Sequence, residues 1–359
     1  MIDIEKAKEL WPETCHGRWM SEEYVPGLVS VIIPTYNRAS LVTEAMDSVW
    51  AQTYRPIELI VVDDGSADNT PVVIEQWGKA HAADEQFELR YFRQENRGAP
   101  AARNLGLIES RGEFIQYLDS DDLLRQAKVA NHVSALMSQV DVDFVYSSSC
   151  GFTRMPRASD VPTAGFPVDE PLLAFLRGLP WHTESGLYRR GICRAVGPWN
   201  NDLWCCQEWE YHCRLCHATR GILFARGVLA DYRVNGQDRI SGQVCSPTYA
   251  RNAARALASV VEQLDLRAVR CRHTRDALAR AHFNVARRAA WAGEQRLCEA
   301  LMSAGQQFAE QPGTRLLLSS FRLSTRLLGH KASGSALEHL LNVTYPIRLA
   351  WRQKRYSSA

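Results

Sequence analysis

The sequence predicts an α/β protein, with a Rossmann-like, mostly parallel sheet that has helices on both faces, followed by a C-terminal α-helical extension. Short apolar runs alternate with helical patterns through residues 28–125, which is typical of a parallel sheet with crossover helices. Acidic residues follow directly after two of these runs, where ligands of such sheets bind. Residues 250–330 are dominated by Ala, Leu and Arg in helical spacing, without a clean repeat period.

The first predicted strand covers residues 28–34, a short β-branched run that reads as buried. Helical spacing follows, with three apolar residues on one face, namely Leu41, Ala45 and Val49. Residues 57–62 predict the second strand. Thr70 followed by Pro71 predicts a helix start, with the threonine as N-cap and the proline at the first helical position.

Residues 87–92 predict a third strand, and a glycine turn at 96–98 leads into a helix over 100–110. Residues 113–118 predict a fourth strand, which runs directly into an acidic segment. Beyond it the pattern weakens, with one further strand predicted at 142–147. The order of these elements predicts a ligand crevice at the carboxyl ends of the strands.

The acidic segment is Asp119-Ser120-Asp121-Asp122, and Asp64 follows another strand. In an extended segment residues i and i+2 point to the same side, so Asp119 and Asp121 are expected to address one ligand. Hard cations such as Mg²⁺ or Mn²⁺ bind carboxylate oxygens and commonly share phosphate oxygens with a substrate. The alternative for this segment alone is an acidic loop or a helix N-cap at Asp122. Its position beside a second acidic strand end favours the metal site.

Other residues of the predicted crevice suit a nucleotide. The segment 34–37 follows the first strand, glycines at 65 and 98 allow tight turns, and Arg97 or Arg103 supplies a cation. Acids at separate strand ends also occur in phospho-acceptor receiver domains. That fold needs a suitably placed lysine and a shorter chain, and this segment fits it poorly.

Four stretches resemble family 2 glycosyltransferases with the GT-A fold, namely Val29–Arg38, Ile60–Ser66, Asn96–Gly106 and Tyr117–Asp122. The resemblance implies transfer of a sugar from a nucleotide diphosphate sugar to an acceptor hydroxyl, with inversion at the anomeric carbon. It also implies a divalent metal, Mn²⁺ or Mg²⁺. The expected acceptor is a glycan or a lipid-linked molecule, and the expected setting is assembly of polysaccharide, lipopolysaccharide or another glycoconjugate.

The resemblance also implies roles for single residues. Asp121 is the expected direct metal ligand, with Asp119 beside the ribose, the metal and the diphosphate. Thr35, Tyr36 and Asp64 are expected to hold the nucleobase and ribose. The full expected donor-binding set is Pro34, Thr35, Tyr36, Asn37, Arg38, Asp64, Gly98, Arg103, Asp119 and Ser120.

A fainter resemblance continues where Gly197-Pro198-Trp199 is followed by Gln207-Glu208-Trp209-Glu210. Glu208 occupies the position at which the family usually has an aspartate as general base, with Glu210 as the runner-up. The longer side chain moves the carboxylate by about 1.5 Å, which matters for a positioned base. The alternative is that Glu208 only complements the helix dipole in the first turn.

Two weaker expectations concern the acceptor and the diphosphate. Trp181, His182 and Glu184 lie in a loop-like stretch that suits either a sugar-acceptor pocket or a surface turn. Arg239 and Ser241 belong to a segment expected to close over the diphosphate, because it contains a glycine and a cation.

The net charge of +2 hides an asymmetry along the chain. Residues 251–359 hold 18 Lys/Arg and 7 Asp/Glu, a balance of +11, whereas the first 250 residues hold 24 and 33, a balance of −9. The basic tail is expected to contact anionic membrane peripherally through residues 315–355. Packing on the catalytic domain and pairing in a homo-oligomer are the alternatives. No nucleic-acid partner is expected, because no recognised motif or aromatic platform is present.

The expected domains are an N-terminal segment over 1–27, a GT-A domain over 28–245 with a nucleotide-sugar half (28–125) and an acceptor half (126–245), and a basic helical extension over 246–359. Residues 1–30 lack the apolar core of a signal peptide, and no run reaches the roughly 18 apolar residues that span a bilayer. A cytoplasmic protein, or one peripheral at the inner face of the membrane, is expected. Two other functions stay open, a catalytically inactive nucleotide- or glycan-binding scaffold and a metal-dependent nucleotidyltransferase.

Overall fold

The computed structural model describes residues 19–82, 84–153, 161–234, 246–264 and 271–358, which form two compact units. Unit 1 contains the described residues of Met1–Pro167, Trp181–Trp204 and Ala218–Asn235. Unit 2 contains those of Val168–Pro180, Cys205–His217 and Gly236–Ala359. The units therefore divide the chain differently from the expected boundary at residue 245, because two segments of the expected acceptor half belong with the C-terminal helices.

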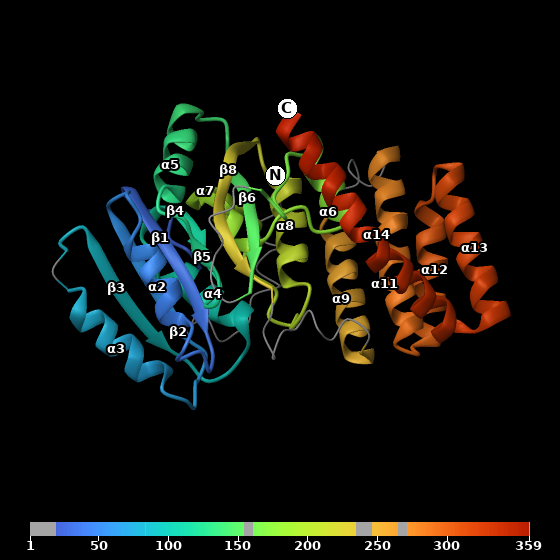
Figure 1. The fold of residues 1–359 in the computed structure, drawn as a ribbon, viewed down its shortest axis with the longest axis horizontal. Coiled ribbons are helices and arrows are strands. Elements are labelled where there is room, and N and C mark those ends of the chain that lie inside the picture. The colour runs from blue at the N-terminus through green and yellow to red at the C-terminus, as the bar shows by residue number, and fades with distance from the viewer. Residues whose placement is uncertain (1–18, 83, 154–160, 235–245, 265–270, 359) are drawn as a thin grey trace. The chain divides into compact units, whose positions relative to one another are not determined.

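In the described part of unit 1, an eight-stranded sheet has the order β3-β2-β1-β4-β7-β6-β8-β5 (Figure 1). Its strands are β1 (Val25–Thr35), β2 (Ile57–Asp63), β3 (Phe87–Arg93), β4 (Gly112–Tyr117), β5 (Leu123–Leu124), β6 (Phe144–Phe152), β7 (Gly186–Arg189) and β8 (Ile222–Arg233). The four strands from β3 to β4 are mutually parallel, and β8 is parallel to β6. β7 and β5 run antiparallel to their neighbours. This mixed, mostly parallel sheet confirms the predicted fold class.

Helices cover both faces of this sheet, as predicted. One face packs against α2 (Val42–Trp50), α3 (Thr70–Ala80) and α5 (Lys128–Ser138), and this side holds the main apolar core of unit 1. α4 (Ala99–Glu109) packs on the other face, against residues that alternate with the core positions of β1. A Cβ at Gly106 of α4 would lie 2.4 Å from Ile32 Cγ2, so this helix can approach β1 only with glycine there. η2 (Thr183–Ser185) and α7 (Arg190–Val196) also belong to this unit.

Two local predictions need correction. Asn69 is the N-cap of α3 and Thr70 is its first helical residue, while the Thr70 hydroxyl accepts a hydrogen bond from the backbone N–H of Arg38 at 2.9 Å. Asp122 does not begin a helix, because the short strand β5 follows it and pairs with β8. The N-cap alternative for Asp122 is therefore wrong.

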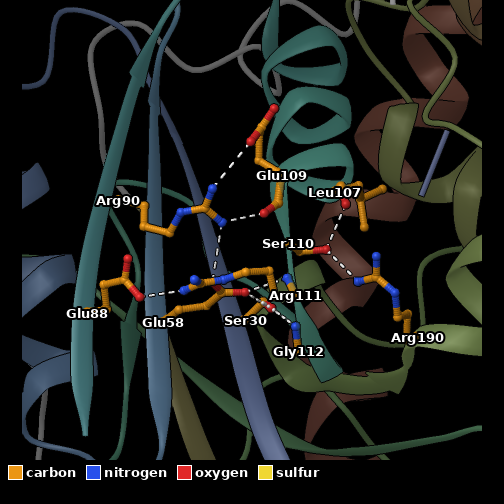
Figure 2. A network of polar contacts seen from close by, with 10 residues as sticks. All are labelled: Ser30, Glu58, Glu88, Arg90, Leu107, Glu109, Ser110, Arg111, Gly112 and Arg190. Carbon is orange, nitrogen blue, oxygen red and sulfur yellow. Dashed lines mark hydrogen bonds and ion pairs between the residues drawn. The ribbon is translucent and has the colours of Figure 1, made fainter. Parts of the chain in front are cut away.

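A buried carboxylate links β1, β2 and β3 to the start of β4 (Figure 2). Glu58 of β2 accepts hydrogen bonds from Ser30 Oγ at 2.5 Å, from Arg111 N at 2.6 Å and from Arg111 Nε at 2.9 Å. Arg90 of β3 lies 3.4 Å from the same carboxylate and also donates to the backbone carbonyl of Glu109. A buried charge is tolerated when cations and hydrogen-bond donors surround it. This network fixes β1, β2 and β3 to the segment that precedes β4.

Unit 2 is helical, and α11 lies at its centre, in contact with α6, α9, α12 and α14. Its helices are α6 (Pro171–Arg177), α8 (Gln207–Ala218), α9 (Pro247–Gln263), α11 (Arg272–Trp291), α12 (Gln295–Phe308), α13 (Pro312–Leu328) and α14 (His330–Ser358). The buried side of α11 is rich in alanine, whose small side chain lets neighbouring helices approach closely. Among the described residues, no helix combines the length and the apolar character needed to cross a membrane.

Candidate active site

Three predicted site segments meet at one edge of the sheet in unit 1. β1 ends at Thr35, and its two neighbours, β2 and β4, run parallel to it. Asp64 follows β2 directly, and Asp119 follows β4 after one intervening residue. A backbone hydrogen bond from Asp64 N to Thr35 O, at 2.9 Å, continues the pairing beyond the strands. The structure therefore brings Asp64 and Asp119 to the same edge, as parallel pairing predicts.

The Asp64 carboxylate holds the glycine turn that precedes α4. Its Oδ1 accepts hydrogen bonds from Gln94 Nε2 at 2.7 Å and from Arg97 N at 2.9 Å, and its Oδ2 accepts one from Gly98 N at 2.7 Å. Gly98 has a φ of 89°, a region that favours glycine. Three of the roughly four acceptor positions of this carboxylate are thus used within the protein. Asp64 therefore links two of the motif stretches, and roughly one acceptor position of its carboxylate stays open to a ligand.

The segment after β1 is attached to the loop after β2. Asn37 has a φ of 51°, its backbone N–H donates to Ser66 Oγ at 2.9 Å, and its Oδ1 accepts from Ala67 N at 2.8 Å. Asparagine tolerates this left-handed conformation better than most residues. The motif asparagine therefore shapes the loop that presents its neighbours.

The residues on either side of Asn37 differ in their solvent exposure. Pro34 is buried within β1, whereas Tyr36 has 45% of its surface exposed. The Thr35 hydroxyl is buried and has no hydrogen-bond partner among the described residues. A buried hydroxyl normally has a partner, so its position at the strand end favours a ligand there. Arg38 is half-buried.

Arg103 and Asn104 connect the acidic segment to the Gly197–Trp199 stretch. Arg103 Nη2 donates to Asp119 Oδ1 at 2.6 Å, and the guanidinium carbon lies 4.6 Å from the centroid of the Trp199 ring. Asn104 Nδ2 donates to Trp199 O at 2.8 Å, and Trp199 N donates to Asn104 Oδ1 at 2.8 Å. Arg103 thus orients Asp119, and Asn104 holds the Gly197–Trp199 stretch in place.

The acidic segment is a turn, in which Asp122 N donates to Asp119 O at 3.0 Å. It is not extended, so the same-side argument for residues i and i+2 does not apply. Arg233, the last residue of β8, donates from its backbone to Asp122 Oδ1 at 2.8 Å and from Nε to Asp121 O at 3.1 Å. Its Nη2 donates to Glu44 on α2 at 2.8 Å. The sequence alone does not place Arg233 at this turn, because its position depends on pairing between β8 and β5.

Buried ionisable groups surround this turn. Burial, reinforced by the Glu184 charge, raises the pKa of Asp122 well above its ordinary value. Burial also raises the pKa of Glu184 to about 8, with a further contribution from the Asp119 carboxylate. Burial lowers the pKa of the Lys128 ammonium, which donates to the backbone carbonyl of Gly186 at 2.9 Å. The carboxyl groups of Asp122 and Glu184 therefore lie close to this turn in a buried setting.

The structure places Trp181 and Glu184, which were expected near the acceptor, inside unit 1. Trp181 is fully buried, and its ring stacks on Tyr146 with centroids 3.9 Å apart. Glu184 is also buried, because η2 packs against β6 and β8. Both side chains are buried in unit 1 and do not lie in a surface turn. The His182 ring lies 4.4 Å from that of Tyr232.

Three further residues were expected at the site, namely Ser120, Arg239 and Ser241. Ser120 is buried between the two acids of the turn. Arg239 and Ser241, expected in a closing loop, lie outside the described residues.

The two candidate bases lie on α8 in unit 2 and differ in their surroundings. Glu208 is half-buried in the first turn. Glu210 is fully buried, and its carboxylate accepts from Arg214 Nε and Nη2, each at 2.9 Å, and from Ser259 Oγ at 2.9 Å. The Glu210 carboxylate is therefore occupied by a structural network.

Two adjacent thiols precede α8. Cys206 has a φ of 58°, which is unusual for a residue with a side chain, and its sulfur lies 3.6 Å from the Tyr249 hydroxyl. A hydrogen bond from the Cys205 thiol lowers the pKa of Cys206 to about 7. Cys205 is buried and its backbone N–H donates to Asn252 at 3.0 Å.

Asp119 and Asp121 fit a hard divalent cation. Their oxygens are the ligands that Mg²⁺ and Mn²⁺ prefer. The pKa of the neighbouring Asp122 is raised first by burial and then by the charges of Glu184, Asp121 and Asp119. In the described parts of the chain, no three His, Cys, Asp or Glu side chains are grouped to hold a metal. Mg²⁺ is commonly bound by one or two carboxylates together with substrate phosphates.

The comparisons with known proteins agree with this geometry. Residues 30–196 match the model of glycosyl transferase family 2, and the match includes all four motif stretches except Val29. An uncharacterized glycosyltransferase of Rickettsia typhi is 35% identical over 140 residues, which cover 39% of this chain and 41% of the relative. The chain thus spans less than half the length of that relative. This match covers a little under half of the chain and shows that residues 30–196 are similar to glycosyl transferase family 2.

Two solved structures share the fold. S. aureus TarS 1-349 in complex with UDP-GlcNAc has a TM-score of 0.60 at 19% identity, covering 89% of this chain and 91% of that one. The mannosyltransferase PcManGT from Pyrobaculum calidifontis, in complex with GDP-Man and Mn²⁺, has a TM-score of 0.54 at 20% identity, covering 94% and 93%. These similarities confirm the GT-A fold.

Proposed function

We propose that this protein is a metal-dependent glycosyltransferase that moves a sugar from a nucleotide diphosphate sugar to an acceptor hydroxyl, with inversion. One observation carries the proposal. The ends of β1, β2 and β4 bring Thr35, Asp64 and the Asp119–Asp122 turn to one edge of the sheet. The sugar nucleotides bound by TarS and PcManGT, and the Mn²⁺ of the latter, support the same ligands here.

In this proposal the nucleoside lies against the ends of β1 and β2. The exposed Tyr36 ring offers a stacking surface, and the unpartnered Thr35 hydroxyl and the remaining acceptor direction of Asp64 offer hydrogen bonds. Asp119 and Asp121 would hold the metal, which offsets negative charge on the departing diphosphate. Arg103 fixes the orientation of Asp119 before the donor binds.

Glu208 is proposed as the general base that takes the proton of the acceptor hydroxyl. Support comes from its place in the motif and from its half-buried position at the start of α8. Glu210 is less suited, because three donors already occupy its carboxylate. The acceptor is proposed to be a glycan or lipid-linked molecule used in polysaccharide or other glycoconjugate assembly, on the cytoplasmic side of the membrane.

The test begins with a panel of nucleotide sugars. Thermal unfolding is followed with each donor, with and without Mn²⁺ or Mg²⁺, and with the nucleotide alone as a control. A bound donor raises the melting temperature as its concentration passes the Kd. Asp121→Asn is expected to remove the metal-dependent part of the shift, whereas Asp141→Asn, an exposed aspartate on the same unit, retains it. An equal, metal-independent shift in both variants would refute the metal site.

Turnover is then measured with the donor that the panel selects. Release of a nucleoside diphosphate is expected, and release of pyrophosphate would instead identify a nucleotidyltransferase. Glu208→Gln is expected to abolish transfer while donor binding is kept, with exposed Glu85→Gln as the control. A wild-type chain that binds the donor but transfers nothing to any acceptor would be a binding scaffold.

A further inference from the structure

The outward side of α13 carries a row of exposed leucines. Leu316, Leu323 and Leu327 are 68%, 56% and 73% exposed, and their spacing places them on one helix face. The opposite face is buried against the bundle through Thr314, Leu318, Phe321 and Thr325. Large apolar side chains grouped on a solvent-facing helix surface are unusual in a soluble monomer and mark an interaction surface.

This face is also basic. α13 contains Arg315, Arg322 and Arg326 and no acidic residue. Arg315 donates to the backbone carbonyl of Ala309, and Arg322 donates to the neutral side chains of Gln306 and Ser303. Because these acceptors carry no charge, the hydrogen bonds do not neutralise the positive charges of Arg315 and Arg322. Over residues 312–358 the sequence holds 8 Lys/Arg and one Asp/Glu.

The acids of the same bundle do not neutralise this surplus, because several are engaged by other arginines of unit 2. Asp276 pairs with Arg280, Glu310 pairs with Arg275, and Glu338 pairs with Arg287. The positive charge on and around α13 is therefore available to an external partner. A second copy of this face would bring like charges together, so the charge favours an anionic partner over self-association.

We propose that the α13 face formed by Leu316, Leu323, Leu327, Arg315 and Arg326 docks on the surface of an anionic lipid bilayer. Leucines that enter the boundary between headgroups and acyl chains, flanked by arginines that meet lipid phosphates, define an interfacial amphipathic helix. α13 lies beside α12 and α14 within unit 2 (Figure 1), so the helix is already folded before it meets the membrane. The surface is independent of sugar transfer.

The test is co-sedimentation of the full chain with vesicles of phosphatidylglycerol and phosphatidylcholine, compared with vesicles of phosphatidylcholine alone. Binding to the anionic vesicles is expected, with weakening at high salt. The triple variant Leu316→Gln, Leu323→Gln, Leu327→Gln is expected to bind at least about tenfold more weakly. Arg315→Gln with Arg326→Gln should weaken binding by roughly fivefold for each arginine.

Met137→Gln and Val140→Gln, which change exposed apolar side chains of unit 1, are the matched controls and should bind like the wild type. Circular dichroism and the melting temperature establish that each variant is folded. Equal binding to both vesicle types, or equal binding of the leucine variant and the wild type, would overturn the proposal. A dimer of the wild type that the leucine variant loses, without vesicle binding, would assign this face to a second copy.

Discussion

Arg103 and Asp119 form an ion pair, with 2.6 Å between Nη2 and Oδ1, in which the cation is buried and the acid keeps 39% of its side-chain surface exposed. The Trp199 ring packs against the guanidinium group and limits its movement. A fixed cation thus orients an exposed carboxylate at the edge where a nucleotide is proposed to bind. Preorganised side chains of this kind lower the cost of binding a ligand.

Arg103→Lys should weaken donor binding by about tenfold and lower the free energy of unfolding by about 1–2 kcal/mol. Lysine keeps the charge but loses both the planar contact with Trp199 and the forked geometry toward Asp119. Titration calorimetry with the donor and urea unfolding measure the two effects. Arg272→Lys on the exposed side of α11 is the control. Wild-type affinity in Arg103→Lys would show that the pair does not prepare the site.

Asn104→Ala should destabilise unit 1 by about 2 kcal/mol, because each of the two hydrogen bonds to the Trp199 backbone contributes about 1 kcal/mol. Urea unfolding followed by tryptophan fluorescence measures the change. Asn131→Ala, at an exposed position of α5, should change stability by no more than about 0.5 kcal/mol. Similar stability losses in both variants would contradict the role of Asn104 in holding the Trp199 backbone.

The sequence patterns predicted the strands well, because buried parallel strands consist of apolar β-branched runs such as residues 28–34 and 57–62. The convergence of Asp64 and Asp119 followed from parallel pairing alone. The hydrogen bonds of Asp64 could not be predicted, since two of its donors are backbone N–H groups. Such a group is present in every residue except proline, so the residue type does not indicate it. Register and long-range pairing likewise decided the place of Arg233.

The aromatic and acidic residues after residue 180 were harder to interpret. Trp181 and Glu184 suit a pocket, a turn or a core equally well by composition, and only the packing of η2 against β6 and β8 decides among these. The assembly of unit 2 from separate stretches depends on tertiary contacts of α6 and α8 with the C-terminal helices. Short helices of this kind carry too little periodicity to show their partners.

Glu210→Gln should lower the free energy of unfolding by about 3 kcal/mol, because it leaves the buried guanidinium group of Arg214 without its carboxylate. Glu208→Gln, at a half-buried position two residues earlier, should change stability by less than about 0.5 kcal/mol. Denaturant unfolding of both variants provides the comparison. Equal stability losses would argue against a purely structural role for Glu210.

Alkylation of Cys206 should show an inflection near pH 7, because the hydrogen bond from Cys205 lowers its pKa to about 7. The thiolate is the reactive form, so the rate rises with pH through this value, below the pKa of about 8.5 of an ordinary cysteine. Iodoacetamide labelling followed by peptide mass spectrometry resolves this site from exposed Cys271. Cys205→Ala is the informative variant, since removal of the hydrogen-bond donor should move the inflection to higher pH. An unchanged inflection in that variant would exclude Cys205 as the cause.

The Glu58 network joins β1, β2 and β3 to the start of β4 at positions away from the carboxyl ends of β1, β2 and β4, which carry the proposed ligand contacts. Changes at positions 36–38 therefore leave that anchoring untouched, since none of its hydrogen bonds involves them. For directed evolution of donor preference, this separation means that libraries randomised at Tyr36 and Arg38 start from a scaffold whose Glu58 anchoring does not involve the varied side chains.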